Sequence, residues 1–300
     1  MKKFHALDSK SEMLQFFVNQ GYLHISGLFD EKLILNCQEY VMNFYSRFSV
    51  AHTRGKLPKD VQAWGNVILD EFTKTDLYSE LIQNQKTIEL IKLFLGPDVA
   101  ILNYDHLWIN VPQNTDPVLK KDIHTDVWTG TGVNTLIANT YFTDADEYNG
   151  LSVIPGSHLQ GLTPVRNRKP DPLYEVEYLL EPIKNLRKGD FIIWHSLLLH
   201  STTGISNENI RISMSSRYTS PDSAFTSQER SLGHKTLTVG PMNHITRLVG
   251  NDYLSPFRTL GGAVAIERRL HNLYGLGDES VKDEWIDYIK ILDSDSRKNE

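Results

Sequence analysis

The strongest constraint on the fold is a change in hydrophobic period along the chain. Between Val99 and Tyr218, apolar residues recur at every second position in short segments that turn-forming residues separate. Six strands are predicted: Val99–Val111, Asn134–Phe142, Leu151–Ile154, Glu175–Leu180, Asp190–Trp194 and Ile210–Tyr218. Short strands between turn signals are typical of a double-sheet jelly roll or a barrel. We therefore expect a mainly β protein with flanking helices and a cupin-like jelly-roll core, the double-stranded β-helix.

The segments before the strands follow helical spacing instead. Three helices are predicted: one capped by Ser9 or Ser11 and ending at Gly21, one from Glu31 to about Phe48, and one over Thr75–Leu95. Lys56–Asn66 is polar and could form a lid, although surface packing is the simpler interpretation of its Trp64. A last helix is predicted to place four apolar residues on one face, namely Val281, Trp285, Ile289 and Leu292.

These patterns predict one domain over residues 1–300. It would consist of an N-terminal helical part (1–98), a β core (99–218) and a C-terminal extension (219–300) that packs on the core. The extension could also serve in a homodimer.

Charge and composition exclude several classes of protein. The net charge of -6 is spread along the chain without a basic stripe, so no nucleic-acid partner is expected. The longest apolar runs, such as Phe191–Trp194, are too short to cross a membrane. The polar N-terminus does not resemble a secretory signal, and the single Cys37 excludes a disulfide framework and a Cys-rich metal site. The expected location is the reducing cytoplasm.

A His-x-Asp triplet, His124-Thr125-Asp126, lies within the β region. Residues two apart on an extended segment point the same way, so both side chains are predicted to face the interior of the core. An imidazole and a carboxylate supply two ligands of the 2-His-1-carboxylate triad. That triad holds Fe(II) and leaves one face open for a cosubstrate and O2. The triplet alone is common by chance, so it needs support from elsewhere in the chain.

A second stretch offers a third ligand and a cation. Gly189-Asp190 opens a predicted strand, His200 follows it, and Arg211 comes eleven residues after His200. The cosubstrate 2-oxoglutarate ends in a second carboxylate, which needs a charge-assisted and preferably bidentate partner when it is buried. Arg211 is predicted to be that partner. Ser213, on the same face of the strand, can add a hydroxyl donor.

Further motifs lie around these residues in a fixed order. Phe142–Gly150 reads FTDADEYNG, Ile154–His158 reads IPGSH, and Lys188–Asp190 opens the segment that leads to Arg211. With these motifs the sequence resembles the phytanoyl-CoA dioxygenase (PhyH) family of Fe(II)/2-oxoglutarate oxygenases, in its bacterial small-molecule branch. The resemblance also includes the N-terminal Phe17–Leu28. It extends discontinuously over residues 13–218.

The resemblance implies a role for each matching residue. The iron ligands of the family correspond to His124, Asp126 and His200. The 2-oxoglutarate-binding residues correspond to Arg211, Thr202, Ser213 and Asn110. Because the strand that carries Asn110 precedes the metal triplet, the side chains that share its face are predicted to line the same cavity. The candidates for substrate contact are His106, Trp108, Trp128 and Asn139.

Several of these assignments have competitors. His195 lies five residues before His200 and is the alternative third ligand, but the eleven-residue step to the arginine favours His200. Arg217 is an alternative anchor for the cosubstrate. His158 is interpreted as a turn-fixing residue. For Trp128, a substrate contact and plain core packing are equally compatible with the sequence.

The resemblance implies a dioxygenase that converts 2-oxoglutarate and O2 to succinate and CO2 while it oxidises a C–H bond. Related halogenases have a small residue at the carboxylate position, so Asp126 favours hydroxylation; desaturation, ring closure and epimerisation remain alternatives. A zinc-dependent hydrolase on the same ligands is a rival, although it would not need Arg211. A catalytically silent binding protein is another. The polar and aromatic cavity residues favour a small, polar or ring-shaped substrate.

Overall fold

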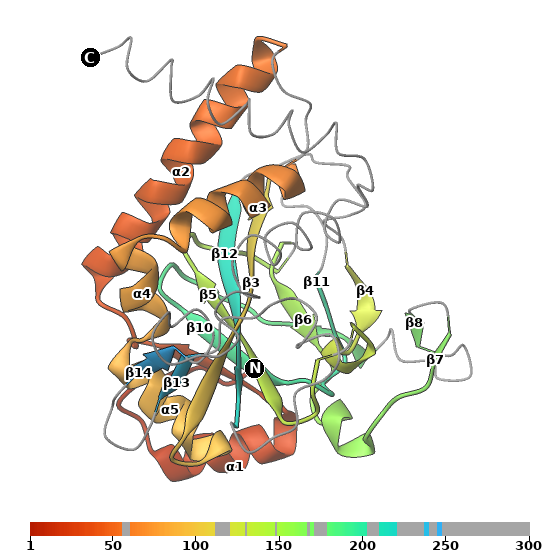
Figure 1. Ribbon diagram of the computed structural model, residues 1–300. Helices are drawn as coiled ribbons and strands as arrows, with labels where there is room; N and C mark the ends of the chain where they lie inside the picture. Colours follow the sequence, from red (N-terminus) through yellow and green to blue (C-terminus); the bar gives the residue numbers. More distant parts are fainter. Residues whose placement is uncertain are drawn as a thin grey trace, which may run out of the picture.

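The computed structural model contains two β-sheets with helices packed on one side (Figure 1). It describes residues 1–55, 61–111, 121–129, 131–147, 149–166, 169–170, 179–202, 210–220, 237–239 and 245–247.

The helices lie mostly in the N-terminal third of the chain. They are α1 (Lys10–Gln20), α2 (Glu31–Thr53), α3 (Val61–Phe72), α4 (Asp76–Ile82) and α5 (Gln85–Leu95), followed later by two 3-10 turns, η2 (Asp126–Thr129) and η3 (Ser157–Gln160). The first helix has the predicted ends. The Ser9 hydroxyl accepts a hydrogen bond from the Glu12 N–H, and Gly21 ends the helix at a φ of 78°, a left-handed conformation that glycine adopts without a steric penalty.

The strands are short except for three near the middle of the larger sheet. They are β1 (Phe4–His5), β2 (Tyr22–Ser26), β3 (Val99–Asn110), β4 (Lys121–His124), β5 (Thr135–Tyr141), β6 (Leu151–Val153), β7 (Val165–Arg166), β8 (Lys169–Pro170), β9 (Glu181–Pro182), β10 (Phe191–His195), β11 (His200–Thr202), β12 (Arg211–Thr219), β13 (Leu237–Val239) and β14 (Ile245–Arg247).

Two main sheets result, and both are open. The larger has the order β1-β2-β10-β5-β12-β3-β13-β14, the smaller has the order β4-β11-β6-β9, and β7 and β8 form a separate hairpin. Among the described strands only β1 and β2 pair in parallel. Antiparallel sheets with this non-sequential order form a jelly roll, which confirms the predicted fold class. The alternative of a closed barrel was wrong.

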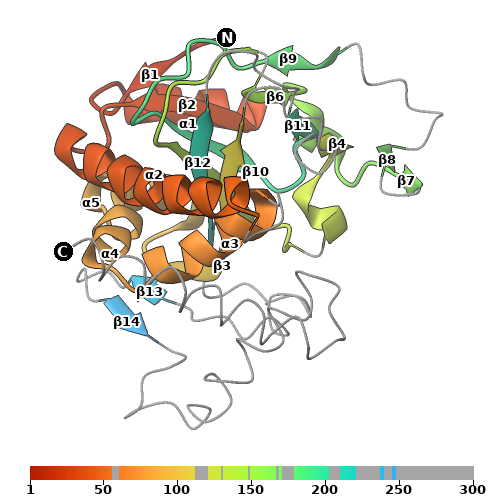
Figure 2. The ribbon, with the colours of Figure 1, turned by 90° about the horizontal axis from the view of Figure 1, so that it is seen from above.

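Alternation along the strands separates the apolar core from the polar interior. On β12, Ile212 and Met214 join the main hydrophobic cluster with the helices, whereas Arg211 and Ser215 point away from it into a pocket. Helices α2 to α5 lie on the apolar side of the larger sheet, and the smaller sheet lies on the other side (Figures 1 and 2). The pocket therefore lies between the two sheets.

Two helix predictions needed correction. The segment predicted as one helix over Thr75–Leu95 is two, because Asn84 interrupts it and caps α5 through a hydrogen bond that its side chain accepts from the Thr87 N–H. Helix α3 was missed. Trp64, interpreted as a surface residue, lies on α3 with 2% of its area exposed, and its ring stacks on Phe48 at a centroid distance of 5.9 Å.

Several predictions fall on residues that the structure does not describe. They include most of the strand Glu175–Leu180 and the whole of the last helix with Val281 to Leu292. Of the predicted extension, β13 is described and pairs with β3. The division into three parts of one domain and the homodimer stay predictions. None of the helices in the described ranges combines the length and the apolar character needed to cross a membrane.

Candidate active site

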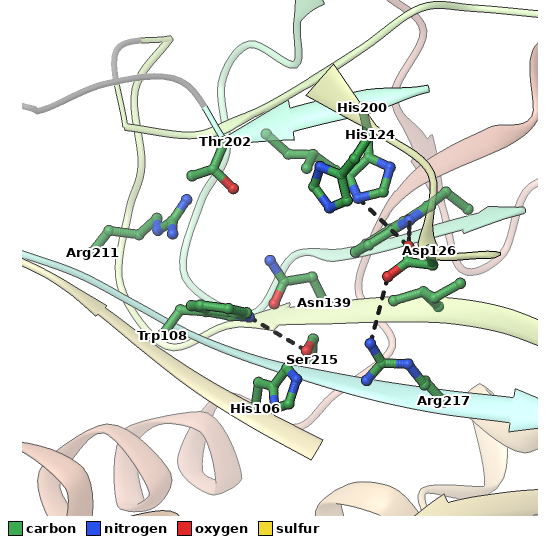
Figure 3. Close-up of a pocket in the computed structure, with 13 residues that line it drawn as sticks. His106, Trp108, His124, Asp126, Asn139, His200, Thr202, Arg211, Ser215 and Arg217 are labelled. Atoms are coloured by element: carbon green, nitrogen blue, oxygen red, sulfur yellow. Dashed lines mark hydrogen bonds and ion pairs between the residues drawn. The ribbon is translucent and has the colours of Figure 1, made fainter. Parts of the chain in front are cut away.

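Three potential metal ligands converge at one end of the pocket (Figure 3). His124 ends β4 and pairs directly across the small sheet with His200, the first residue of β11. Asp126 opens the turn η2 rather than continuing the strand, which differs from the extended segment that the sequence predicted. Even so, one ligand atom from each of the three residues lies within 4.8 Å of the others. This spacing is small enough for one ion to contact all three.

Hydrogen bonds set the tautomers of both histidines. The Nδ1 atom of His124 is 2.7 Å from the Asp122 carbonyl oxygen, and the Nδ1 atom of His200 is 2.9 Å from the Leu198 carbonyl oxygen. A carbonyl oxygen only accepts, so each Nδ1 carries the proton and donates. The lone pair then lies on Nε2, where a metal can bind it.

The Asp126 carboxylate lies between two buried donors. Its Oδ2 accepts a hydrogen bond of 3.0 Å from the Trp194 indole, and its Oδ1 is 3.5 Å from a guanidinium nitrogen of Arg217. Burial alone would raise the pKa of this carboxyl. Favourable electrostatic interactions with His200, Arg217 and His124, together with the indole hydrogen bond, outweigh burial and lower the pKa to about 2. Asp126 is therefore ionised at neutral pH.

At the other end of the same pocket lies Arg211, which is 3% exposed. Its Nη1 donates a hydrogen bond of 2.5 Å to the Asn149 carbonyl oxygen, while its Nε has no hydrogen-bond partner. No carboxylate among the described residues forms an ion pair with Arg211. Burial lowers the pKa of its guanidinium, but an arginine remains charged at neutral pH. This end of the pocket carries a buried positive charge that no carboxylate of the described ranges balances.

Other polar groups near Arg211 also lack partners. Asn110 pairs with Arg211 across β3 and β12, and its buried side-chain oxygen has no hydrogen bond. The same is true of the buried Ser213 hydroxyl, two residues along the face of β12. Thr202 lines the pocket on the side of the smaller sheet, as Figure 3 shows. Unsatisfied buried polar atoms are rare in folded proteins, so their concentration around a cation indicates a binding site for a polar ligand.

The rest of the wall comes from the larger sheet. His106 and Trp108 lie on β3, Asn139 on β5 and Ser215 on β12. The Trp108 indole donates a hydrogen bond of 3.4 Å to the Ser215 hydroxyl, and the His106 ring meets the Trp108 ring edge-on at a centroid distance of 5.4 Å. The pocket encloses about 480 Å³, part of which is open to solvent. Its wall therefore combines an aromatic ring with several hydrogen-bonding groups.

The motif around Asn149 builds the turn that holds Arg211. The Asn149 side chain accepts from the Asp146 N–H, and the Asp146 carboxylate accepts from the Asn149 N–H. Gly150 follows in a position where a Cβ would come within 2.8 Å of the Asp146 carbonyl oxygen. The close backbone approach explains the glycine, and the turn aims the Asn149 carbonyl at the guanidinium.

Two further motifs support β11, which carries His200, and β10, which precedes it. The Ser157 hydroxyl accepts a hydrogen bond of 2.9 Å from the Leu199 N–H, directly before His200. The buried Asp190 carboxylate accepts from the His24 ring, the Lys3 ammonium and the Arg187 N–H, each at 2.8 Å. These contacts tie the start of β10 to the N-terminal segment. Both motifs therefore have structural roles outside the pocket.

The structure places some predicted residues elsewhere. Trp128 is not among the lining residues; its indole donates to the Thr163 carbonyl oxygen, and its ring packs against a small apolar cluster. His195 lies against His158 at a ring distance of 5.4 Å, where burial and then the charge of His158 lower its pKa to about 4. His158 approaches the Val18 carbonyl oxygen through its Nε2, so it links η3 to α1.

Three pocket residues were missed or undervalued. Trp194 was interpreted only as part of an apolar strand, yet its indole contacts Asp126 and its ring lies 5.3 Å from that of His200. Ser215 was not singled out. Arg217 was considered only as an anchor for the cosubstrate. Its period-two relation to Arg211 was visible in the sequence, but its contact with Asp126 depends on how the two sheets pack.

The residues present fit a metal ion and a dicarboxylate together. Two neutral imidazole Nε2 atoms and an ionised carboxylate form the donor set of a 2-His-1-carboxylate site. The guanidinium of Arg211, which has no carboxylate partner among the described residues, lies at the opposite end of the cavity, with unsatisfied polar groups around it. Two separate stretches of the sequence thus contribute to one pocket, with the metal-ligand triad at one end and the buried arginine at the other.

Comparison with solved structures gives the same fold. The epimerase SnoN in complex with Fe3+, alpha ketoglutarate and nogalamycin RO is similar with a TM-score of 0.57 and 17% identity, over 72% of this chain and 85% of that one. The alpha ketoglutarate dependent carbocyclase SnoK has a TM-score of 0.52 and 18% identity, over 75% and 89%. EctD from S. alaskensis with bound Fe has a TM-score of 0.50 and 16% identity, over 71% and 78%.

Sequence comparison identifies the family. No curated protein matches the chain. The family model for phytanoyl-CoA dioxygenase (PhyH) matches residues 17–213, about two thirds of the chain and nearly the whole described core. The matched region contains the triad residues and Arg211. The chain belongs to the phytanoyl-CoA dioxygenase (PhyH) family, which confirms the predicted class of enzyme, a non-haem iron, 2-oxoglutarate-dependent oxygenase.

Proposed function

We propose that this protein is a dioxygenase that uses Fe(II), 2-oxoglutarate and O2 to hydroxylate an aliphatic C–H bond of a small, polar metabolite or natural product. His124, Asp126 and His200 would hold the iron, and Arg211 would bind the distal carboxylate of 2-oxoglutarate with help from Asn110, Thr202 and Ser213. The observation that carries the proposal is one pocket that has a ligand triad at one end and, at the other, a buried arginine without a carboxylate partner in the described part of the chain.

Each side chain has a defined task in this proposal. The bound iron and 2-oxoglutarate supply the oxidising chemistry, with succinate and CO2 as coproducts. The two backbone carbonyls that accept from the histidines orient the imidazoles. Arg211 fixes one end of the cosubstrate, and the apolar Ile137 and Leu151 in the pocket wall restrict water.

The substrate wall supports a polar molecule. His106, Asn139 and Ser215 offer hydrogen bonds, and Trp108 offers a flat aromatic surface next to them. A sugar-like or amino-acid-derived ring would match these groups. The retained carboxylate of Asp126 favours hydroxylation, although the similar structures include an epimerase and a carbocyclase. Epimerisation, ring closure and desaturation are therefore alternatives on the same ligands.

Succinate formation tests the proposal. Purified protein with iron, ascorbate and 2-oxoglutarate should release succinate slowly alone and faster with the correct metabolite from a panel of small polar compounds. The control is Arg211→Met, which should need far more 2-oxoglutarate. Hydrolysis of a substrate with zinc and no succinate under any condition would favour the rival hydrolase, while undetectable metal binding would favour a silent protein.

A further inference from the structure

The third ligand of the proposed metal site is held by both of its oxygens. Trp194 donates to Asp126 Oδ2 at 3.0 Å, and Arg217 approaches Oδ1 at 3.5 Å. Figure 3 shows Arg217 below the carboxylate and both histidines above it. The side chains of Asp126 and Arg217 are 9% and 5% exposed, so water competes little for either.

The two oxygens face different partners. Oδ2 is the oxygen toward the imidazoles, because it lies 3.5 Å from His200 Nε2, the atom that carries the lone pair. Oδ1 faces Arg217 instead. Rotation of the carboxylate about its χ2 bond would break both contacts, and the guanidinium opposes that rotation by binding one oxygen.

We propose that Arg217 is a positioning residue for the metal site: by binding Oδ1 it holds Asp126 so that a single oxygen, Oδ2, faces the ion. The inference rests on the proposed metal site and deepens it. Nothing in the family match assigns this role, since residue 217 lies beyond the matched residues 17–213.

A role for Arg217 in binding the cosubstrate is less consistent with these contacts. Its charge is already balanced by Asp126, whereas Arg211 on the same strand has no carboxylate partner among the residues that the structure describes. Arg217 also faces the triad end of the pocket in Figure 3, and Arg211 faces the opposite end. Arg217 is therefore paired with Asp126, whereas Arg211 is the arginine that we assign to the cosubstrate carboxylate.

Metal affinity provides the test, because it does not depend on turnover. Co(II) binding would be measured by calorimetry and by the visible absorption of the bound ion. Removing a residue that orients a metal ligand weakens binding about 10- to 100-fold. Arg217→Met should show this loss together with an altered Co(II) spectrum. Arg217→Lys keeps the charge and should recover most of the affinity, and Arg211→Met should bind Co(II) as the unmodified protein does.

A double-mutant comparison separates positioning from a general loss of structure. If Arg217 acts through the carboxylate, adding Arg217→Met to Asp126→Ala should weaken Co(II) binding no further. If Arg217→Met lowered Co(II) affinity equally in the unmodified protein and in Asp126→Ala, its effect would be indirect and the inference would be overturned. Unchanged Co(II) affinity and spectrum in Arg217→Met would overturn it as well. If Arg217→Met fails to fold, Arg217→Lys provides the test. A Co(II) spectrum like that of the unmodified protein supports the role of the charge. A loss of 2-oxoglutarate affinity as large as that in Arg211→Met contradicts it. If the unmodified protein binds no metal at all, the proposed function fails first.

Discussion

Arg211 and Arg217 are the same residue type on the same face of β12, and both are almost fully buried, at 3% and 4% exposure. Their surroundings differ. Arg217 lies against the Asp126 carboxylate, whereas Arg211 contacts a backbone carbonyl and has no ion-pair partner in the described part of the chain. Charge compensation, rather than residue type or burial, therefore indicates which end of the pocket can bind an anionic ligand.

The largest expected effect comes from changing a proposed metal ligand. Changing His124 to Ala should remove metal binding and lower turnover on the order of 1,000-fold or more, because the metal contributes several kcal/mol to catalysis. Asp126→Ala should lose turnover to the same degree. Metal titration and succinate release measure both effects. Normal metal affinity in His124→Ala would remove this residue from the proposed site.

The same two variants should differ in stability. Asp126→Ala leaves Arg217 buried without its carboxylate, and breaking a buried ion pair in this way costs about 3–5 kcal/mol. His124 is only half-buried, and its Nδ1 contacts a nearby backbone carbonyl. Its loss should therefore cost much less. Urea unfolding of the metal-free proteins provides the measurement, and equal destabilisation would contradict the contrast.

The two arginines should also respond differently to removal. Arg217→Met leaves the ionised Asp126 buried with one partner fewer, so we expect a loss of about 3 kcal/mol in metal-free protein. Arg211→Met removes a buried charge that none of the described carboxylates balances, so its unfolding free energy should change by less than about 1 kcal/mol. Reversal of this order in urea unfolding would show that the charges are compensated differently from the observed contacts.

In cosubstrate binding the order of the two arginine variants should be reversed, with the larger effect in Arg211→Met. Arg211→Met should weaken 2-oxoglutarate binding about 10- to 100-fold, the range expected when a charge-assisted hydrogen bond to a buried carboxylate is lost. Arg217→Met should affect it less at saturating metal. Calorimetry with 2-oxoglutarate in the presence of Co(II) measures both. Unaltered affinity in Arg211→Met would exclude this arginine as the anchor.

A pH-dependent effect on stability alone is expected at a carboxylate outside the pocket. Hydrogen bonds from His24 and Lys3 outweigh burial and lower the pKa of Asp190. A carboxyl with a depressed pKa in the folded state adds stability above its unfolded pKa of about 3.9, and that contribution is lost as the pH falls further. Asp190→Asn should cost about 1–3 kcal/mol at pH 7, and the difference should shrink below about pH 4.

The control for Asp190→Asn is ligand binding in the pocket. Asp190 ties β10 to the N-terminal segment and contacts no triad residue. Asp190→Asn should therefore leave Co(II) and 2-oxoglutarate affinities unchanged in the folded protein. A tenfold change in either affinity would mean that the two carboxylates are coupled through β10.

Local patterns predicted most of the fold and the proposed ligands. The period of two placed β3, β5 and β12 within a residue or two of their observed ends, and the motifs around His124, His200 and Arg211 indicated the residues that line one pocket. These signals are local, since each depends on alternation or on a short spacing in the chain.

Contacts between distant segments could not be predicted in the same way. The partners of Asp126 come from β10 and β12, and only the packing of the two sheets brings Trp194 and Arg217 to it. Trp128 follows the triplet closely, yet its indole contacts the Thr163 carbonyl instead of the pocket. Trp64 was interpreted as exposed because the residues before it are polar, whereas the helix that it belongs to is buried.

An anaerobic titration tests the central claim most directly. Adding 2-oxoglutarate to the protein with Fe(II) should produce the visible charge-transfer absorption of a 2-oxo acid chelated to ferrous iron. This band should be absent in His124→Ala and should need a much higher 2-oxoglutarate concentration in Arg211→Met. Saturating 2-oxoglutarate binding without such a band, or an identical band in all three proteins, would contradict it.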